Sequence, residues 1–392
     1  MTASDLCAEG IMIQNQQHSG GIRSAPSSAF VPFLAFLLWG FGCSGYEIEI
    51  REYDFDRAYN GYTYFSVWSA GRIIAVDMDG TTLWNSFDLG KISMGTANGF
   101  RYIEEESLVV CLRNEKPMAV RTDDYEVVFD GKYDKAHHSV LMTPERTIMY
   151  LARERIDGIV GDFWSPEGCL LADVIKEIEM DTKEIIWEWH LIDHLDPTEN
   201  HASQKSFLSE LHECPEWAHG NSIKFIPNYS YQGNNYSTVL YNARFLDTFW
   251  MIDYASGDVL WSCGQHGTFG RRESPEEVVF SATHEVDIVT DDTFIMYDNG
   301  SNRSSLRSRA LKISVDPLTD EVAEIWSWRH PDMYDWWGGD ADELPNGNVL
   351  IANTTQGRII EVTPEGEIVW DMRIGLNSFT PHSVYQLQRV PY

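Results

Sequence analysis

Four histidines of this 392-residue chain each stand at the start of an apolar, strand-like run: His138, His219, His284 and His382. An imidazole can act as a nucleophile, an acid or a base near neutral pH. Arg244, in LYNAR, and Arg309, in SRALKISVD, lie close in sequence to two of these runs. A guanidinium offers a rigid set of donors that fits the oxygens of sulfate or phosphate. Together these residue types predict a site for an oxyanion.

The four histidines form a site only if their strands are equivalent members of a repeat. One further run, GDADELPNGNVLIANT, has Asp340 at the equivalent place. Any one of these histidines could be an ordinary packed residue, but four at the same position favour convergence on one axis. His137 should point the opposite way from its neighbour and be structural. For Arg303 and Arg307, surface ion pairs are the better interpretation in such an acidic chain.

A repeated hairpin supplies the strands. Alternating apolar residues flank a turn rich in Asp, Thr and Gly, and each second strand ends near an aromatic residue: Trp84, Phe129, Trp187, Trp261, Trp326 and Trp370. Alternation on both sides of a turn is a hairpin signal. Six such hairpins, 44 to 74 residues apart, predict an all-β fold, a six-bladed β-propeller.

The first blade lacks an opening strand, because GYTYFSVWSAG leads directly into its hairpin. The C-terminal segment PHSVYQLQRV, residues 381–390, would supply that strand and close the ring, which removes two sheet edges. Long loops are expected at 154–172 and 195–217, with a helix at 206–217. The acidic and histidine-containing run 193–201 matches no standard set of metal ligands, so we expect a solvated loop there, and no metal or cofactor.

Residues 1–45 are expected to form an export signal, and residues 46–392 the propeller. A short apolar run at 29–43 ends in small residues and Cys43, and translation could start at Met12. Lipidation at Cys43, the one expected membrane attachment, and simple secretion are equally compatible with this run. Either outcome places the mature protein outside the cytoplasm, in the periplasm or cell envelope.

The cysteines and the charge restrict the class of protein further. Cys169 and Cys214 lie in loop-like stretches and are the first expected disulfide pair in an oxidising compartment. The formal net charge of −31 argues against a nucleic-acid partner, because such a field repels phosphate backbones. No glycine-rich phosphate loop, HExxH or GxSxG motif is present.

Several segments resemble the bacterial arylsulfate sulfotransferase family over about residues 60–390. The matching pieces are WEWHLIDHLDP, EWAHGNSI, YNARFLDTFWMID, SRALKISVD, LPNGNVLI and SVYQLQRV. The resemblance implies an exported six-bladed propeller that moves a sulfuryl group from an aryl sulfate to a phenol without a nucleotide donor. It implies that His219 and Asn221 match a W-x-H-x-N segment, and that His284 and Arg309 match further sulfate-binding residues.

The sequence departs from the family at one place. The family's best-studied branch carries a transiently sulfated histidine just after the strand equivalent to NVLIANTTQGR, and residues 331–381 contain none here. Another channel histidine could replace it, in the order His284, His219, His382, or transfer could be direct. We expect His219, His284, Arg309 and His382 to act in catalysis, and His138, Asn221, Arg244 and Asp340 to bind substrate. Trp336 and Trp337 could stack on the aryl ring. A non-catalytic anion-binding propeller and a hydrolase or lyase on anionic substrates remain alternatives.

Overall fold

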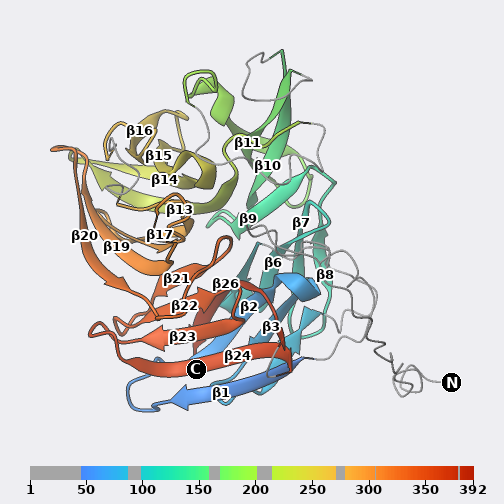
Figure 1. The fold of residues 1–392 in the computed structure, drawn as a ribbon. Helices are drawn as coiled ribbons and strands as arrows, with labels where there is room; N and C mark the ends of the chain where they lie inside the picture. Colours follow the sequence, from blue (N-terminus) through green and yellow to red (C-terminus); the bar gives the residue numbers. More distant parts are fainter. Residues whose placement is uncertain are drawn as a thin grey trace, which may run out of the picture. The chain divides into compact units, whose positions relative to one another are not determined.

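The computed structural model describes residues 46–86, 99–158, 168–200, 214–270, 279–304, 306–377 and 380–392. Its strands form six antiparallel sheets, arranged around a centre (Figure 1). The predicted all-β, six-bladed propeller is confirmed. The helices in the described ranges are three-residue 3₁₀ turns, too short and too polar to cross a membrane: η3 (Trp68–Ala70), η5 (Glu104–Glu106), η6 (Leu191–Asp193) and η8 (Arg244–Leu246).

The first three blades follow the hairpin pattern of the sequence. Blade one contains β2 (Gly61–Val67), β3 (Arg72–Val76) and β4 (Thr82–Asn85), with a fourth strand from the C-terminus. Blade two contains β5 (Phe100–Ile103), β6 (Leu108–Arg113), β7 (Lys116–Arg121) and β8 (Val127–Asp130). Blade three contains β9 (Ala136–Met142), β10 (Ile148–Asp157), β11 (Cys169–Ile178) and β12 (Ile185–His190).

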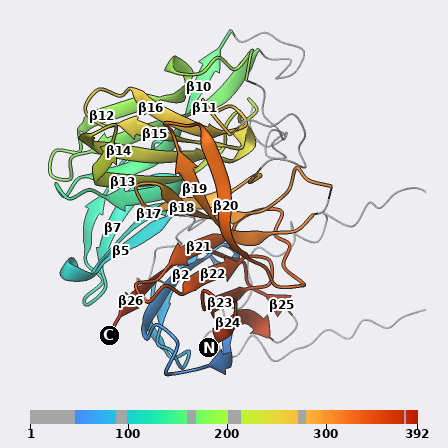
Figure 2. The same cartoon turned by 90° about the vertical axis from the view of Figure 1, so that its left-hand side faces the viewer.

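The other three blades complete the ring. Figure 2 shows blades four and five side by side. Blade four contains β13 (Gly220–Tyr231), β14 (Asn234–Ala243), β15 (Thr248–Asp253) and β16 (Val259–Gly264). Blade five contains β17 (His284–Thr290), β18 (Thr293–Asp298), β19 (Arg309–Asp316) and β20 (Glu321–Trp328). Blade six contains β21 (Asp340–Glu343), β22 (Val349–Asn353), β23 (Arg358–Val362) and β24 (Ile368–Asn377), which also pairs with β25 (Thr380–Pro381).

The ring closes twice at its seam. β26 (Val384–Pro391) pairs with β2 and supplies the inner strand of blade one, which confirms the predicted closure. β1 (Glu47–Tyr53) pairs with β24 and adds a fifth main strand to blade six. The sequence did not predict this second closure, because an isolated EIEIREY run fits the edge of any blade.

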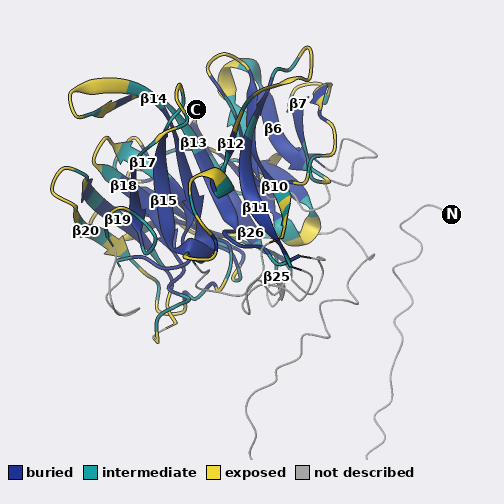
Figure 3. Ribbon diagram, turned by 90° about the horizontal axis from the view of Figure 1, so that it is seen from above, coloured by how far each residue is buried: buried dark blue, intermediate teal, exposed yellow. Residues whose placement is uncertain are grey.

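The aromatic residues of the repeat lie in the last strand of each hairpin, which is the outermost strand except in blade six, where β1 lies outside β24. Several of them bind the next blade. The indole N–H groups of Trp187, Trp326 and Trp370 donate to backbone carbonyls of Tyr254, Pro364 and Met78, at 3.0, 2.9 and 2.9 Å. Each bond crosses from one blade to its neighbour. In Figure 3 the strands are mostly buried and the turns between them exposed, because both faces of each sheet pack on adjacent sheets.

The expected loop at 154–172 is wrong, and the expected helix at 206–217 lies mostly outside the described residues. The stretch 154–172 is not one long loop, because β10 extends to Asp157 and β11 starts at Cys169. Most of the expected helix at 206–217 lies outside the described residues. Its last residues carry an isolated bridge between Leu171 and Glu216.

Candidate active site

The inner strands of the six blades bring the site together. β26, β5, β9, β13, β17 and β21 contact one another in a closed circle around the axis. His138 belongs to β9, His219 directly precedes β13, and His284 is the first residue of β17. All three side chains are buried. The repeat therefore delivers three histidines from three consecutive blades.

His138 and His219 are in direct contact, with ring centroids 4.6 Å apart. Both have left-handed backbones, with φ of 56° and 53°, a conformation that non-glycine residues rarely adopt. Such strained positions cluster at functional sites. Gly220 follows His219 because a Cβ there would lie 2.6 Å from the Tyr241 ring and 2.9 Å from Asp173 Oδ2.

His219 is oriented by a buried carboxylate. Its Nδ1 lies 2.6 Å from Glu216 Oε2, and Glu216 Oε1 lies 2.5 Å from Arg153 Nε. Burial alone would raise the pKa of Glu216, but its interactions with His219 and Arg153 lower it well below its usual value. An ionised Glu216 accepts a hydrogen bond from Nδ1–H and leaves Nε2 as the ring nitrogen with a lone pair.

His138 is oriented by a second relay. Its Nδ1 lies 2.8 Å from His137 Nδ1, and His137 Nε2 lies 3.3 Å from Asp173 Oδ1. Burial, reinforced by His219, lowers the pKa of His138 well below its usual value, so this imidazole is neutral. The expectation that His137 points away is wrong, because its ring contacts the His138 ring. With His137 as the acceptor, His138 Nε2 carries a lone pair.

His284 has both ring nitrogens occupied. Nδ1 lies 2.7 Å from Asn299 Oδ1, and Nε2 accepts a hydrogen bond of 3.1 Å from the backbone N–H of Gly338. Burial, followed by the charge of Arg244, lowers its pKa well below the usual value. A neutral imidazole that uses both nitrogens has no free lone pair to attack sulfur. Among the predicted nucleophiles, His219 therefore fits better than His284.

Arg244 and Tyr385 complete the cluster. Arg244 Nη2 donates to the backbone oxygen of Trp336 at 2.6 Å, and burial lowers the Arg244 pKa to about 10, which still leaves it charged at neutral pH. The Tyr385 ring lies 6.0 Å from His138 and 5.9 Å from His284, centroid to centroid. Within the described ranges, neither Arg244 Nε nor Tyr385 Oη has a hydrogen-bond partner, although both atoms are buried.

Two predicted catalytic residues are placed differently. Arg309 lies on β19, two strands outward from β17, and its guanidinium binds Asp298 at 2.8 Å, Glu324 at 2.6 Å and the Val279 carbonyl at 2.8 Å. These contacts make it part of an ion-pair network in blade five, as they do for Arg303, which also binds Asp298. His382 precedes β26, is partly exposed, and has Nδ1 3.0 Å from Ser69 Oγ.

Two predicted binding residues have structural partners. Asn221 donates to the Thr283 carbonyl at 2.7 Å and accepts from Asn242 at 2.7 Å, so it joins blades four and five. Asp340 Oδ2 accepts from the backbone N–H of Leu387 at 2.9 Å. Burial raises the pKa of Asp340 well above its usual value, and Asp342 and Glu285 add to the effect. Asp340 thus belongs to a buried charged group on the axis.

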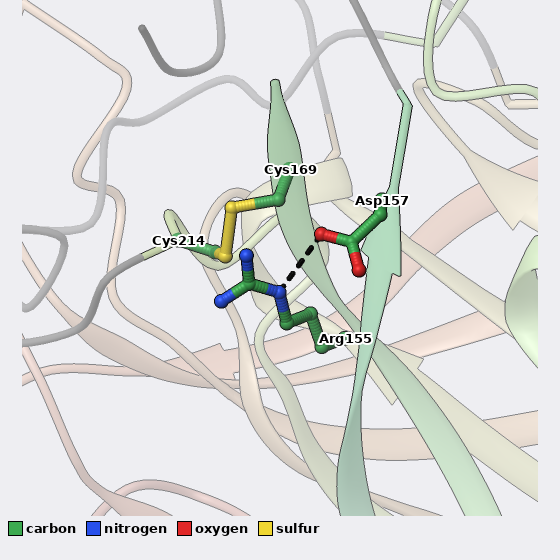
Figure 4. The surroundings of a disulfide bond; sticks show 4 residues. All are labelled: Arg155, Asp157, Cys169 and Cys214. Atoms are coloured by element: carbon green, nitrogen blue, oxygen red, sulfur yellow. Dashed lines mark hydrogen bonds and ion pairs between the residues drawn. A yellow bond between two sulfur atoms is a disulfide. The ribbon is translucent and has the colours of Figure 1, made fainter. Parts of the chain in front are cut away.

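The disulfide fixes the segment that carries Glu216. Cys169 and Cys214 are bonded, as predicted, and Figure 4 shows the bond beside the ion pair of Arg155 and Asp157. The backbone after Cys214 binds β11 on both sides of Glu216, through Leu171 N to Pro215 O at 2.8 Å and Trp217 N to Leu171 O at 3.0 Å. The covalent link therefore holds the orienting carboxylate in register with His219.

Other parts of the described structure offer weaker candidates for a functional site. A surface cavity of about 340 Å³ is lined by residues of blade six, β1 and the loop after β20, including Arg51, His330 and Arg373. The histidine cluster does not line it, and its arginines share it with Glu49 and Asp332. Among the described residues, no group of acidic, histidine or cysteine side chains could hold a metal ion.

Three residues of the cluster were missed in the sequence. Glu216 lies three residues before His219, and the EWAH motif could have signalled the pair. Tyr385 lies three residues after His382, and only the start of β26 at Val384 shows that it reaches the axis. The role of Asn299 as a partner of His284 has no local sequence signal.

Comparisons with known proteins give one sequence match and many structural ones. The family model described as Arylsulfotransferase (ASST) matches residues 113–375. No curated protein matches the chain. A protein of unknown function from Bacteroides caccae shares 9% identity over 80% of this chain and 93% of its own, with a TM-score of 0.48. The periplasmic gluconolactonase of Pseudomonas aeruginosa shares 9% identity over 84% and 99%, with a TM-score of 0.48. Virginiamycin B lyase from Staphylococcus aureus shares 11% over 83% and 88%, with a TM-score of 0.42. Likenesses at this level carry no argument about activity.

Proposed function

Because the chain belongs to the arylsulfotransferase family, we propose that the histidine cluster transfers a sulfuryl group from an aryl sulfate ester to a phenolic acceptor. One observation carries this proposal. His138 and His219, each with Nδ1 engaged elsewhere, contact each other, and the backbone N–H of the buried Arg244 donates to the His219 carbonyl at 3.3 Å, while Arg244 Nε has no partner among the described residues. The unpaired guanidinium N–H can donate to an oxygen of a tetrahedral anion, one lone pair can attack its sulfur, and the other can accept a proton.

His219 is the proposed nucleophile. When its Nε2 bonds to sulfur, the ring becomes positively charged, and the Glu216 carboxylate 2.6 Å from Nδ1 stabilises that charge. The Nδ1 of His138 instead faces the imidazole of His137, which carries no negative charge and therefore cannot stabilise a positive charge on the His138 ring. In the first step the N–S bond forms, the bond from sulfur to the phenolic oxygen breaks, and the phenolate leaves with the electron pair.

The second step returns the sulfuryl group to an acceptor phenol. The phenol oxygen attacks sulfur, the N–S bond breaks, and His138 Nε2 accepts the proton from the phenol hydroxyl. Arg244 faces the sulfuryl oxygens in both steps and neutralises their charge. His284 holds the loop that carries Trp336 and Gly338, through its bond to Gly338. Trp336, 44% exposed, and Trp337 form an aromatic rim that can stack on the aryl groups.

The test is a single-turnover experiment with a chromogenic aryl sulfate, with and without added phenol. We expect a burst of phenolate from the donor alone, one sulfated imidazole located at His219 by peptide mapping, and steady turnover once phenol is added. His219→Ala should abolish the burst. His190→Ala is the matched control, because His190 Nδ1 also binds a glutamate, Glu154 at 2.9 Å, but lies half-buried on blade three.

The alternatives are distinguished by the same experiment. Phenolate release that continues without an acceptor would indicate a hydrolase, and elimination products would indicate a lyase. Binding of the aryl sulfate without any release would indicate a non-catalytic propeller. Sequential kinetics with no labelled histidine would refute the covalent route through His219.

We also propose export, with residues 1–45 as a signal and Cys43 as the candidate lipid attachment site. Support comes from the Cys169–Cys214 disulfide, since such bonds persist mainly in oxidising compartments. The N-terminal sequence of the mature protein and its mass would test this. A mature chain that retains residues 1–45 would refute the proposal.

A further inference from the structure

Tyr385 differs from four other buried tyrosines of the propeller. Tyr150, Tyr229, Tyr241 and Tyr297 have hydrogen-bond partners in Asp134, Trp261, Asp173 and Asp335. The Tyr385 side chain is 2% exposed, yet its hydroxyl has no partner among the described residues. Leaving a buried hydroxyl unpaired is costly. A hydroxyl kept in that state at the axis indicates a group that binds there.

The ring contacts show where such a group would lie. His138 contacts both His219, at 4.6 Å, and Tyr385, at 6.0 Å between ring centroids. Among the described side chains, no ring contact joins His219 directly to Tyr385. His219 and Tyr385 therefore both adjoin His138 without touching each other through their rings, so a sulfuryl group bound in this cluster would meet them at separate places. In an in-line displacement the attacking and leaving atoms are on opposite sides of the transferred group.

We infer that the Tyr385 hydroxyl is the hydrogen-bond donor for the phenolic oxygen that leaves sulfur in the first half-reaction and attacks it in the second. This inference rests on the proposed function. The S–O bond breaks as the N–S bond to His219 forms, and the electron pair stays on the phenolic oxygen, which accepts the Tyr385 hydrogen bond. No proton is transferred from Tyr385, and the phenolate departs as an anion.

The surroundings of Tyr385 favour a donor over an acid. Burial raises its pKa well above the usual value, Glu285 adds to this, and Arg244 acts in the opposite direction. The hydroxyl thus keeps its proton at any pH the protein meets and is available for donation. Arg244 cannot fulfil the same role as well, because its Nη2 is held by the Trp336 carbonyl and its charge is needed by the sulfuryl oxygens.

Tyr385→Phe tests the inference without changing the shape of the side chain. The variant should be assayed with a series of aryl sulfates whose phenols range from acidic to weakly acidic. A more basic phenolate gains more from a hydrogen bond, so the loss of turnover should grow along the series. We expect about 10²–10³-fold for the least acidic phenol, the range seen when one oxyanion donor is removed, and about tenfold or less for a nitrophenol.

Thermal unfolding gives the second readout. Because the hydroxyl has no partner, Tyr385→Phe should leave the Tm unchanged or raise it. Tyr241→Phe is the matched control, and it should lower the Tm, since its hydroxyl donates to Asp173 at 2.7 Å. A lower Tm for Tyr385→Phe would mean a structural role and would overturn the inference.

The outcomes separate this inference from the function on which it rests. A wild-type protein without transfer activity would overturn both. An active wild type, with equal losses for every donor in Tyr385→Phe or no loss at all, would overturn the role of Tyr385 and leave the proposed function standing.

Discussion

The substitution Glu216→Gln tests whether the buried carboxylate activates His219. It removes one negative charge and keeps the size of the side chain. Glu216 Oε2 lies 2.6 Å from His219 Nδ1, so the charge on the carboxylate and the charge on the sulfated ring would be separated by about 4 Å. At an effective dielectric constant of about 20 this attraction is about 4 kcal/mol.

That energy corresponds to about a 10³-fold loss in the rate of sulfation, since about 1.4 kcal/mol is a factor of ten. Replacing the orienting carboxylate of a comparable catalytic triad by its amide costs about 10⁴-fold, so the two estimates agree within tenfold. The burst of phenolate in a stopped-flow experiment measures this step directly. Substrate binding should change little, because Glu216 does not face the anion.

Loss of stability must be separated from loss of catalysis. Arg153, 2.5 Å from Glu216, would be left without its charged partner, and breaking a buried pair costs about 3–5 kcal/mol. The Tm and the folded fraction must therefore be measured with the rate. Glu154→Gln is the matched control, because Glu154 also binds a histidine, His190 at 2.9 Å, outside the site. A Glu216→Gln burst within threefold of wild type would refute the role of Glu216 and, with it, the choice of His219.

Three further predictions concern other parts of the molecule. Arg309→Ala should lower stability by about 3 kcal/mol, because it breaks a buried pair with Asp298. The kcat of the folded fraction should stay within threefold of wild type. A steep loss of kcat at unchanged Tm would contradict the placement of Arg309 outside the site. Reduction of the Cys169–Cys214 bond, which closes a loop of 45 residues, should cost about 4 kcal/mol and also slow the burst, so a reduced protein with full activity would show that the bond does not position Glu216. Burial raises the pKa of Asp342 to about 6, above the value of about 3.9 in an unfolded chain. The folded state therefore binds the proton of Asp342 more tightly than the unfolded state does. The protonated Asp342 contributes its full stabilisation below a pH of about 4, and this contribution is lost as the pH rises through about 6. The Tm should therefore fall between a pH of about 4 and a pH of about 6, and Asp342→Asn should reduce that fall.

Much of the fold could be predicted because the repeat is encoded locally. Trp187, Trp326 and Trp370 mark the last strand of each hairpin, and their indole N–H groups bind the next blade. A signal that recurs in each blade survives errors at single positions. The β1 strand carries no such signal, since its pairing with β24 depends on an edge that exists only after blade six has formed.

The site could be predicted only where the repeat determines it. Equivalent strand positions correctly brought His138, His219 and His284 together. His382 does not occupy the position equivalent to the other histidines, because β26 begins only at Val384. Tyr385 is the residue of this segment whose ring contacts His138 and His284.

Arg309 shows a different limit. Its residue type suits an oxyanion, but Asp298 and Glu324 bind it first. Competition between partners is a property of three-dimensional distance, and a single sequence does not reveal it.

The double closure at the seam has a consequence for the time at which activity can appear. β26 supplies Tyr385, while the histidines come from blades made much earlier in synthesis. The site lacks the wall that carries Tyr385 until β26 has been made and has docked on β2. The order of synthesis would then delay the reactive chemistry, because the histidines, which are made first, stay without Tyr385 until β26 has docked.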